Sequence, residues 1–402
     1  MNKITTNNNL LLYPDAVQRI HKDLEIALTN WDYLSSVGGE GPIAEFESAF
    51  VKAVGGQYAI ALTNATSALY VALMSLGIGR GDEIILPSYT WPQTLTPVIV
   101  TGATPVFADI EKDAVTVSPK SVAALISKKT RAIIGVHLFG FPADVYALEE
   151  IARRAKCHLI YDAAQGFGSF YDSKPVGSYG DFSAFSFGRS KLFSIGEGGA
   201  LICRTRDLYE RAIAFSQHPL RMHKDVDNHR MRESIDGVSM NFRMHPLIAS
   251  LALGQLKGLN DSNECRRLRA TFMAIYKKAH LAKIKNYFSK ISAASSPSGV
   301  AFPIILKDKK DRSSLQSSIE DLGLEIYEGG TQKPLHLSST IQQHKLLSQY
   351  GLNSAMISEH HTHIKGSCPK TEERCRLPQL FLREGNGRHE KKMVTKYAKR
   401  NG

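Results

Sequence analysis

Short apolar runs alternate with helical patterns between residues 58 and 203, and this alternation constrains the fold more than any other feature. Strands that alternate with helices predict a mostly parallel sheet covered on both faces. Because crossovers between parallel strands are right-handed, the loops that follow the strands should lie along one crevice, where ligands bind. The expected strands cover residues 58–63, 83–86, 131–136, 158–162, 183–187 and 200–203, and the expected helices between them include 66–76 and 147–155.

The remaining patterns predict a helix ahead of the sheet and a smaller unit after it. The first helix is expected over residues 14–29, and a helical pattern runs from residue 246 to about 282. A serine-rich loop is expected over 289–298, followed by a strand at 302–306 and a helix at 313–322. We therefore expect an α/β protein with two domains.

The predicted domains are residues 1–258, with the sheet and the N-terminal helix, and residues 259–402, a smaller C-terminal α/β domain with a basic tail. The second part contains 25 Lys and Arg against 13 Asp and Glu, so it carries the whole formal net charge of +12. This charge indicates either solubility alone or a surface that attracts phosphorylated or acidic substrates. Nucleic acid is not expected as a partner, because no reading motif accompanies the basic tail.

Membrane and secretory signals are not expected from this composition. The apolar runs are much shorter than the roughly 18 residues needed to cross a bilayer, and residues 1–9 are polar. Five cysteines without tight spacing argue against a disulfide framework. We expect a cytoplasmic protein that does not bind membranes.

Two features at strand ends are suited to binding the edges and the face of a ligand. Residues 63–69 are small or hydroxyl-bearing and open a helix, so their N–H groups suit a phosphate, although Asn64 or Thr66 could be an ordinary N-cap. Trp91 follows another strand, next to a proline, and could stack on a flat ring or simply pack in the core. Neither feature is specific by itself.

Two further strand ends carry ionisable groups. Asp162 ends an apolar strand, and a buried carboxylate needs a partner such as a protonated ring nitrogen; the alternative is that it caps the next turn. Lys191 lies between a strand that ends near Ser186 and a glycine-rich turn. A lysine among apolar neighbours can attack an aldehyde, whereas most lysines only lie on the surface. Together the four features match pyridoxal phosphate, which needs a Schiff-base lysine, an acid, a stacking partner and a phosphate cup.

The chain resembles the DegT/DnrJ/StrS sugar aminotransferases, which are fold-type I pyridoxal-phosphate enzymes. The resemblance runs from the glycine-rich residues 38–42 to about residue 256, and more weakly to residue 336. Its strongest motifs are Ser-Phe at 186–187 with Lys191 and Gly-Glu-Gly-Gly at 196–199, and Asp-Ala-Ala-Gln at 162–165. Val-His-Leu-Phe-Gly at 136–140 and Asn-Phe-Arg-Met at 241–244 also fit. The resemblance implies a large domain with a mostly parallel sheet and a smaller α/β domain.

The resemblance also implies roles for single residues. Lys191 would bind the cofactor covalently and act as the base, and Asp162 would pair with the ring nitrogen. Gln165 would lie near the ring hydroxyl and Trp91 would stack on the ring. His336 corresponds to a family position near the substrate. The residues implied in phosphate binding are Ala65, Thr66 and Ser186 of one subunit and Asn241 of the partner, because the family's sites form between the subunits of a homodimer.

By this resemblance, the expected reaction moves an amino group from glutamate or glutamine to a keto sugar in two half-reactions. A nucleotide-linked sugar is the first expectation, and a cyclitol ketone the second, because Trp91 stands where nucleotide-sugar members normally have Phe. Ala65 replaces the family's usual Gly, and Gly188 replaces a common His. The segment 218–232 is also longer than usual.

Three other functions remain open at this point. A dehydratase could use the same cofactor on a sugar, although relatives with His in place of the lysine are excluded by Lys191. A sensor without catalysis could share the fold, but no extra domain or DNA-binding motif is seen. The residues His-His-Thr-His at 360–363 lie near Cys368 and Cys375, but their spacing is not typical of a metal site, and no metal is expected.

Overall fold

The computed structural model describes most of the chain. The described residues are 4–5, 11–35, 37–234, 238–261, 263–281, 289–299, 301–306, 315, 324–328, 334–338, 366–376 and 380–384.

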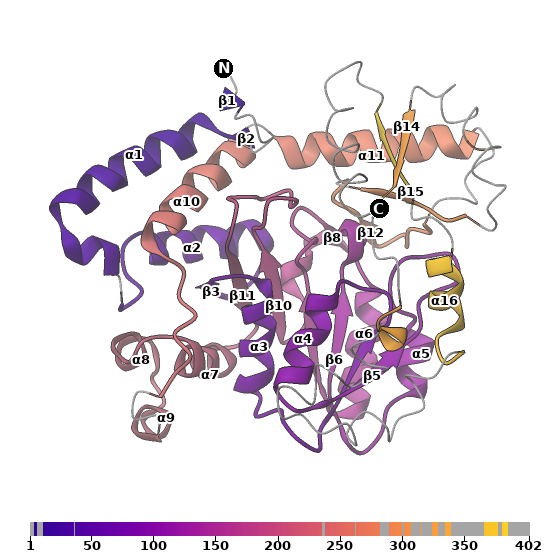
Figure 1. The fold of residues 1–402 in the computed structure, drawn as a ribbon, viewed down its shortest axis with the longest axis horizontal. Coiled ribbons are helices and arrows are strands. Elements are labelled where there is room, and N and C mark those ends of the chain that lie inside the picture. The colour runs from indigo at the N-terminus through magenta and orange to yellow at the C-terminus, as the bar shows by residue number, and fades with distance from the viewer. Residues whose placement is uncertain are drawn as a thin grey trace.

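A seven-stranded sheet forms the centre of the fold, in the order β3-β11-β10-β7-β6-β4-β5 (Figure 1). Its strands are β3 (Tyr58–Leu62), β4 (Glu83–Pro87), β5 (Thr104–Ala108), β6 (Thr130–Val136), β7 (His158–Asp162), β10 (Phe182–Ser186) and β11 (Gly199–Cys203). Within this sheet β11 runs antiparallel to both of its neighbours, and the five strands from β10 to β5 are parallel. The prediction of a mostly parallel sheet is confirmed.

Helices cover both faces of the sheet. On one face lie α3 (Ala65–Ser75), α4 (Pro92–Val100) and α7 (Arg206–Ser216). The opposite face is covered by α5 (Pro119–Ala124) and α6 (Val145–Ala155) towards the β5 edge, and by α2 (Pro42–Val54) and α10 (Pro246–Asp261) towards the β3 edge. All five residues of β4 are buried, because an interior strand of such a sheet meets apolar side chains on both faces.

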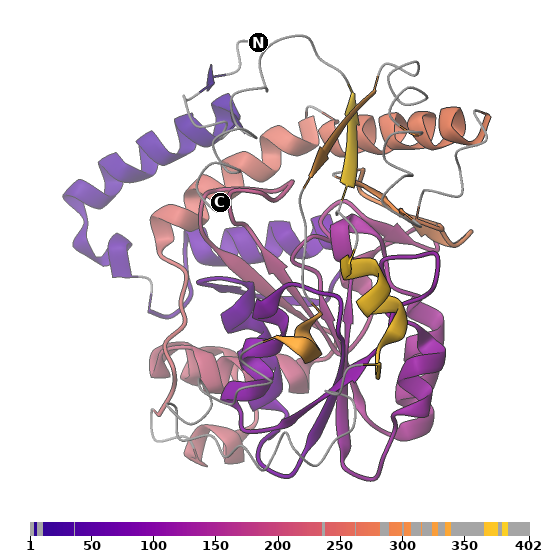
Figure 2. The ribbon, with the colours of Figure 1, turned by 45° about the vertical axis from the view of Figure 1, so that its right-hand side comes forward.

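Helix α1 (Pro14–Thr29) lies where the sequence predicts a helix, and it packs along α10 in both views (Figures 1 and 2). Two glycines of α10 allow the close approach. A side-chain carbon at Gly254 would lie 2.4 Å from the Cα of Ala16, and one at Gly258 would lie 2.2 Å from the Cβ of Tyr13. Larger residues at these two positions would push α1 away.

The single long helix expected from residue 246 to 282 is wrong. The chain forms α10 and then α11 (Glu264–Leu281), and Asn263 between them has a positive φ of 53°. A residue in this left-handed conformation ends a helix. The periodicity continued across the break because both helices bury one face.

The smaller elements complete the described fold. A second sheet has the order β13-β15-β14, all antiparallel, and Figure 2 shows it next to α11. The expected serine-rich loop contains a short strand that pairs with β8. The expected helix at 313–322 lies outside the described residues except for Leu315. The predicted domain boundary at residue 258 stays a prediction, and this residue falls inside α10.

The remaining strands are β1 (Ile4–Thr5), β2 (Leu11–Leu12), β8 (Phe170–Tyr171), β9 (Lys174–Pro175), β12 (Ser295–Ser296), β13 (Phe302–Ile304), β14 (Leu324–Glu328) and β15 (Leu380–Glu384). Remaining helices are α8 (Pro219–Asp225), α9 (His229–Ser234) and α16 (Pro369–Arg376), with the 3₁₀ turns η1 (Trp31–Ser35), η2 (Leu138–Gly140), η3 (Val176–Ser178) and η5 (Leu335–Leu337).

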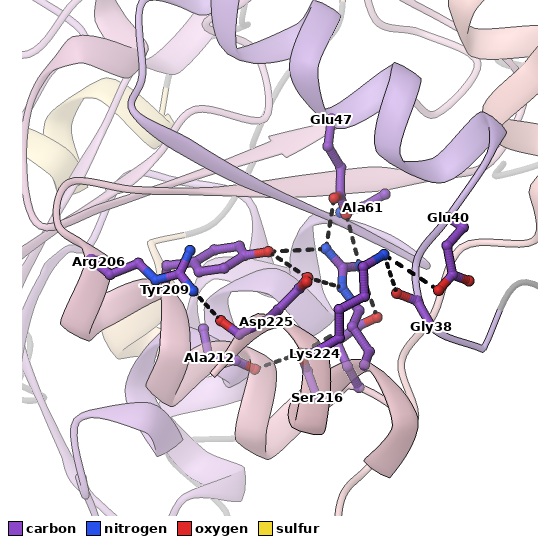
Figure 3. Close-up of polar contacts among 12 residues, drawn as sticks. Gly38, Glu40, Glu47, Ala61, Arg206, Tyr209, Ala212, Ser216, Lys224 and Asp225 are labelled. Carbon is purple, nitrogen blue, oxygen red and sulfur yellow. Dashed lines mark hydrogen bonds and ion pairs between the residues drawn. The ribbon is translucent and has the colours of Figure 1, made fainter. Parts of the chain in front are cut away.

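A buried ion network ties α8 to the sheet. Arg221 of α8 is 1% exposed, and its guanidinium donates two hydrogen bonds to Glu47 of α2, at 2.6 and 3.0 Å. Its Nε also donates to Asp225 at 3.0 Å, and Glu47 accepts the backbone N–H of Ala61 in β3 at 2.7 Å. Figure 3 shows Glu47 reaching down towards Tyr209 and Asp225. Removal of one partner would leave a buried charge uncompensated.

Candidate active site

A cavity of about 330 Å³ opens where β3, β4, β6, β7 and β10 end. Most of the site residues predicted from the sequence meet in its wall: Ala65, Thr66, Trp91, Asp162, Gln165, Ser186 and Lys191. The other lining residues are Asn64, Leu69, Thr90, Gln93, Thr94, Val136, His137, Leu138, Ala164 and Ser190. Parallel strands place their carboxyl ends at one edge of the sheet, which is why features so far apart in sequence converge here.

Asp162 lies at the end of β7 and is 7% exposed. Its Oδ2 accepts a hydrogen bond from the hydroxyl of Thr94 at 2.6 Å, and its Oδ1 accepts one from the backbone N–H of Ala164 at 3.0 Å. Burial raises the pKa of this carboxyl, while the two hydrogen bonds and the charge of Lys191 oppose the rise. The second bond is the turn cap that the sequence left as the alternative, so Asp162 caps the turn and also faces the cavity.

Lys191 follows β10 and is half-buried. Burial lowers the pKa of its ammonium, and the negative charge of Asp162 opposes this effect. Its loop rests on buried aromatic rings: Phe193 is 5.2 Å from Phe167 and 4.9 Å from Phe187, between ring centroids. This aromatic support fixes the backbone that carries the amine.

Glycines shape the turn after Lys191. Gly196 and Gly198 have backbone φ angles of 94° and 142°, which residues other than glycine rarely adopt. A side-chain carbon at Gly199 would lie 2.4 Å from the carbonyl carbon of Asn64. The glycine-rich motif is therefore needed to bring β11 against the start of α3.

The start of α3 forms the end of the cavity that is suited to an anion. Asn64 is the N-cap: its side chain accepts the N–H of Ser67 at 2.8 Å, and the hydroxyl of Ser67 accepts the N–H of Asn64 at 3.3 Å. Ala65 and Thr66 occupy the first two helical positions, whose N–H groups have no partner within a helix. The N-cap alternative is thus confirmed for Asn64, and the next two residues line the cavity beside it.

Two other predicted residues lie on the wall with defined orientations. The Oε1 of Gln165 accepts the backbone N–H of Phe139 at 2.5 Å, so its amide NH₂ is the end left to donate. Trp91 is the N-cap residue of α4 and is 54% exposed. A large exposed aromatic at a cavity rim is consistent with stacking on a ligand.

Asn241 and His336 do not line the cavity. Asn241 is exposed and has a positive φ of 59°. His336 is fully buried, with Nδ1 2.5 Å from the hydroxyl of Ser88 and Nε2 3.1 Å from Glu372. It joins the C-terminal segment to the end of β4, so its predicted role near the substrate stays a prediction.

The sequence indicates no role for Thr94, which the structure places in the cavity wall. Thr94 lies on the first turn of α4, three residues after Trp91. No spacing rule points from Thr94 to Asp162, because the contact joins residues 68 positions apart. His137, in the motif at 136–140, also borders the cavity, but its ring stacks on Tyr161 and the residue is fully buried.

No cluster of potential metal ligands occurs in the described part of the chain, which does not include 360–363. Among the described residues, no helix has the length and apolarity needed to span a membrane.

Comparison with known proteins gives a consistent answer. The model of the DegT/DnrJ/EryC1/StrS aminotransferase family matches residues 23–367. GDP-perosamine synthase of Escherichia coli O157:H7 is 36% identical over 246 residues, which are 61% of this chain and 64% of that protein. The match therefore spans slightly less than two thirds of this relative.

Two solved structures share the fold over nearly their whole length. DesV of S. venezuelae, solved in complex with a ketimine intermediate, is 26% identical with a TM-score of 0.69, covering 96% of this chain and 94% of DesV. An aminotransferase from Psychrobacter cryohalolentis is 24% identical with a TM-score of 0.71, covering 95% and 92%.

The sheet covered by helices on both faces is thus a fold that this chain shares with these solved structures. The chain belongs to the DegT/DnrJ/EryC1/StrS aminotransferase family, as its motifs predict.

Proposed function

We propose that the protein is a pyridoxal-phosphate-dependent aminotransferase that moves an amino group from glutamate or glutamine to a nucleotide-linked keto sugar. One observation carries this proposal: the amine of Lys191 and the carboxyl of Asp162 face the same cavity, each with a pKa shifted by burial. Groups with perturbed pKa values in one cavity are candidates for catalysis.

The cavity fits the cofactor in its donor and acceptor groups. The N-terminus of α3, with Thr66 and Ser186, would hold the phosphate, and Asp162 would hold a protonated ring nitrogen. Gln165 would donate to the ring oxygen, and Trp91 would cover the ring face. When bound, pyridoxal phosphate supplies an aldehyde for a covalent bond to an amine and a ring that accepts electrons.

Lys191 would do the proton transfers. Because burial lowers the pKa of its ammonium, a neutral amine is available at lower pH than for an exposed lysine. In the first half-reaction Nζ would take a proton from the α-carbon of the amino donor and deliver it to the former aldehyde carbon of the cofactor. In the second half-reaction it would take a proton from that carbon and deliver it to the acceptor carbon. On the opposite side of the site, the ionised Asp162 would keep the ring nitrogen protonated through both half-reactions.

A second hollow of about 230 Å³ shares Ala164, Gln165, Ser190 and Lys191 with the first, and we place the acceptor there. The relative named GDP-perosamine synthase favours a nucleotide-linked sugar. A cyclitol ketone is the second candidate, favoured by Trp91 at the rim. We propose a homodimer in which Asn241 of one subunit completes the phosphate site of the other, and a cytoplasmic location.

The test is the release of keto acid from glutamate and from glutamine, measured with a panel of nucleotide-linked keto sugars and inososes. Amine formation on an acceptor, with one equivalent of keto acid, supports the proposal. Without acceptor, the release of at most one equivalent of keto acid per bound cofactor supports two separate half-reactions. Loss of a sugar hydroxyl without keto acid would indicate the dehydratase, and a protein that stays colourless with pyridoxal phosphate would overturn the enzyme proposal. Lys191→Ala is the control without transfer.

A further inference from the structure

Phe139, in the turn η2 after β6, has a backbone conformation that bulky residues rarely adopt. Its φ is 55° and its ψ is 22°, which lie in the left-handed region. Among the described residues other than glycine, it is the only apolar one with a positive φ. Such conformations persist where the surrounding structure holds them, and they cluster at functional sites. This backbone therefore requires an explanation.

Contacts on both sides of Phe139 hold the turn in place. The carbonyl of Gly140, which itself has a φ of 79°, accepts the hydroxyl of Ser169 at 2.8 Å and the backbone N–H of Ser298 at 3.3 Å. The Phe139 ring packs against the main core, edge-to-face with the buried Tyr89 and 6.4 Å from it between centroids. The packed ring and the anchored carbonyl offset the cost of the left-handed backbone.

The left-handed conformation directs one hydrogen-bond donor at the candidate site. The backbone N–H of Phe139 donates to Oε1 of Gln165 at 2.5 Å, although the two residues are 26 positions apart. Both residues line the hollow that also contains Lys191. A change of φ to the usual negative range would reorient this N–H. The amide of Gln165 would then be free to turn over and present its oxygen, instead of its NH₂ group, to a ligand.

We propose that Phe139 is a positioning residue: its left-handed backbone directs the N–H that fixes the amide of Gln165, so that the amide NH₂ donates to the ring oxygen of pyridoxal phosphate. The aromatic ring of Phe139 acts through packing alone, because it holds the strained backbone in place. This inference rests on the proposed function, since the ring oxygen belongs to the proposed cofactor.

Alanine and glycine at position 139 separate this role from ordinary packing. Both remove the ring and keep the backbone N–H, but only Phe139→Gly can keep the left-handed conformation without a steric cost. For a residue with a Cβ atom, that cost shifts a conformational equilibrium by roughly five- to thirtyfold. We therefore expect Phe139→Gly to hold the amide of Gln165 better than Phe139→Ala does. Leu192 lines the same hollow and has no positive φ, so the same pair of substitutions there is the matched control.

The first readout is the affinity of the full-length apoenzyme for pyridoxal phosphate, measured by absorbance titration. Phe139→Ala should bind it at least about fivefold more weakly than Phe139→Gly, which is the lower end of the conformational cost. At Leu192, the glycine variant should bind no more tightly than the alanine variant. A smaller difference at position 139, the reverse order, or an equal gain from glycine at Leu192 would overturn the proposal.

The second readout is the pH midpoint of the absorbance change of the bound cofactor. The midpoint of Phe139→Ala should lie at higher pH than that of Phe139→Gly, because a lost donor to the ring oxygen disfavours its ionised form. In a Gln165→Leu background the two variants should have the same affinity and the same midpoint, since the amide through which Phe139 acts is absent. A difference that persisted in this background would show that Phe139 acts elsewhere and would reject the inference.

Two further outcomes are decided in advance. Failure of Phe139→Gly to fold would reject the inference, because glycine should relieve the strain at this position. If only Phe139→Ala fails to fold, Phe139→Val takes its place, since a β-branched residue resists the left-handed region even more strongly. A wild type that bound no pyridoxal phosphate would refute the proposed function itself, so the two failures are distinct.

Discussion

The hydroxyl of Thr94 provides the most direct test of how Asp162 is kept ionised. Thr94 donates to Asp162 at 2.6 Å, and both side chains are buried. Thr94 has one proton to give, so in its 3.0 Å contact with Thr90 the hydroxyl of Thr90 is the donor. The two threonines therefore form a short chain of hydroxyls that ends on the carboxylate, and such chains strengthen each bond.

The substitution Thr94→Val removes this donor at nearly constant volume. A buried hydrogen bond to a charged group contributes about 1.5–3 kcal/mol, which corresponds to roughly tenfold to hundredfold in an equilibrium constant. Since the bond favours the ionised form, its loss raises the pKa of Asp162 further above its ordinary value. We therefore expect pyridoxal phosphate to bind roughly tenfold to hundredfold more weakly. We also expect the acid limb of the kcat/KM profile to move to higher pH.

The assay is absorbance titration with pyridoxal phosphate, followed by the pH profile of keto-acid release. Thr94→Ser keeps the hydroxyl and should restore both quantities. Thr96→Val, on the same helix, removes an exposed hydroxyl that donates only to the carbonyl of Pro92 at 3.3 Å, and it should behave like the wild type. If Thr94→Val bound the cofactor as tightly as Thr96→Val, the argument that Thr94 keeps Asp162 ionised would be refuted.

Three further predictions concern other parts of the molecule. The amine of Lys191 should react with aldehydes with a pH midpoint below that of free lysine, and Asp162→Asn should lower it again, because the aspartate charge raises this pKa; a midpoint at or above free lysine contradicts the burial argument. A mixed dimer of Lys191→Ala and Asn241→Ala subunits should regain one sound site, and no gain over the parents would argue against shared sites. Arg221→Met should lower the free energy of unfolding in urea by about 3–5 kcal/mol, because Glu47 is left buried and charged; the double variant with Glu47→Gln should recover part of the loss.

Much of the fold follows from local patterns. The helix at α1 and every strand of the central sheet except β5 are predicted well, because each buries one or two continuous apolar faces. The break between α10 and α11 was missed, since a single left-handed residue, Asn263, leaves the apolar periodicity almost intact. The pairing of β12 with β8 was also missed, because two-residue strands carry no periodic signal.

The candidate site, like the fold, could be predicted from local sequence patterns only in part. Lys191, Asp162 and Gln165 stand in short motifs at strand ends, and their convergence follows from the topology of a parallel sheet. Thr94 was not found, because its importance depends on which neighbour its side chain meets. The sequence also gives no sign that His336 is buried between Ser88 and Glu372, and its role near the substrate stays a prediction.

The sequence by itself determined most of the succession of strands and helices along the chain and singled out the candidate amine and acid, because periodicity and short motifs are local properties of a chain. Only the tertiary structure decided how strongly those two groups are desolvated and which donors reach the acid. Desolvation and hydrogen bonding act over a few ångströms between residues distant in the chain, so they exist only after Thr94, Lys191 and Asp162 have been brought together by the fold.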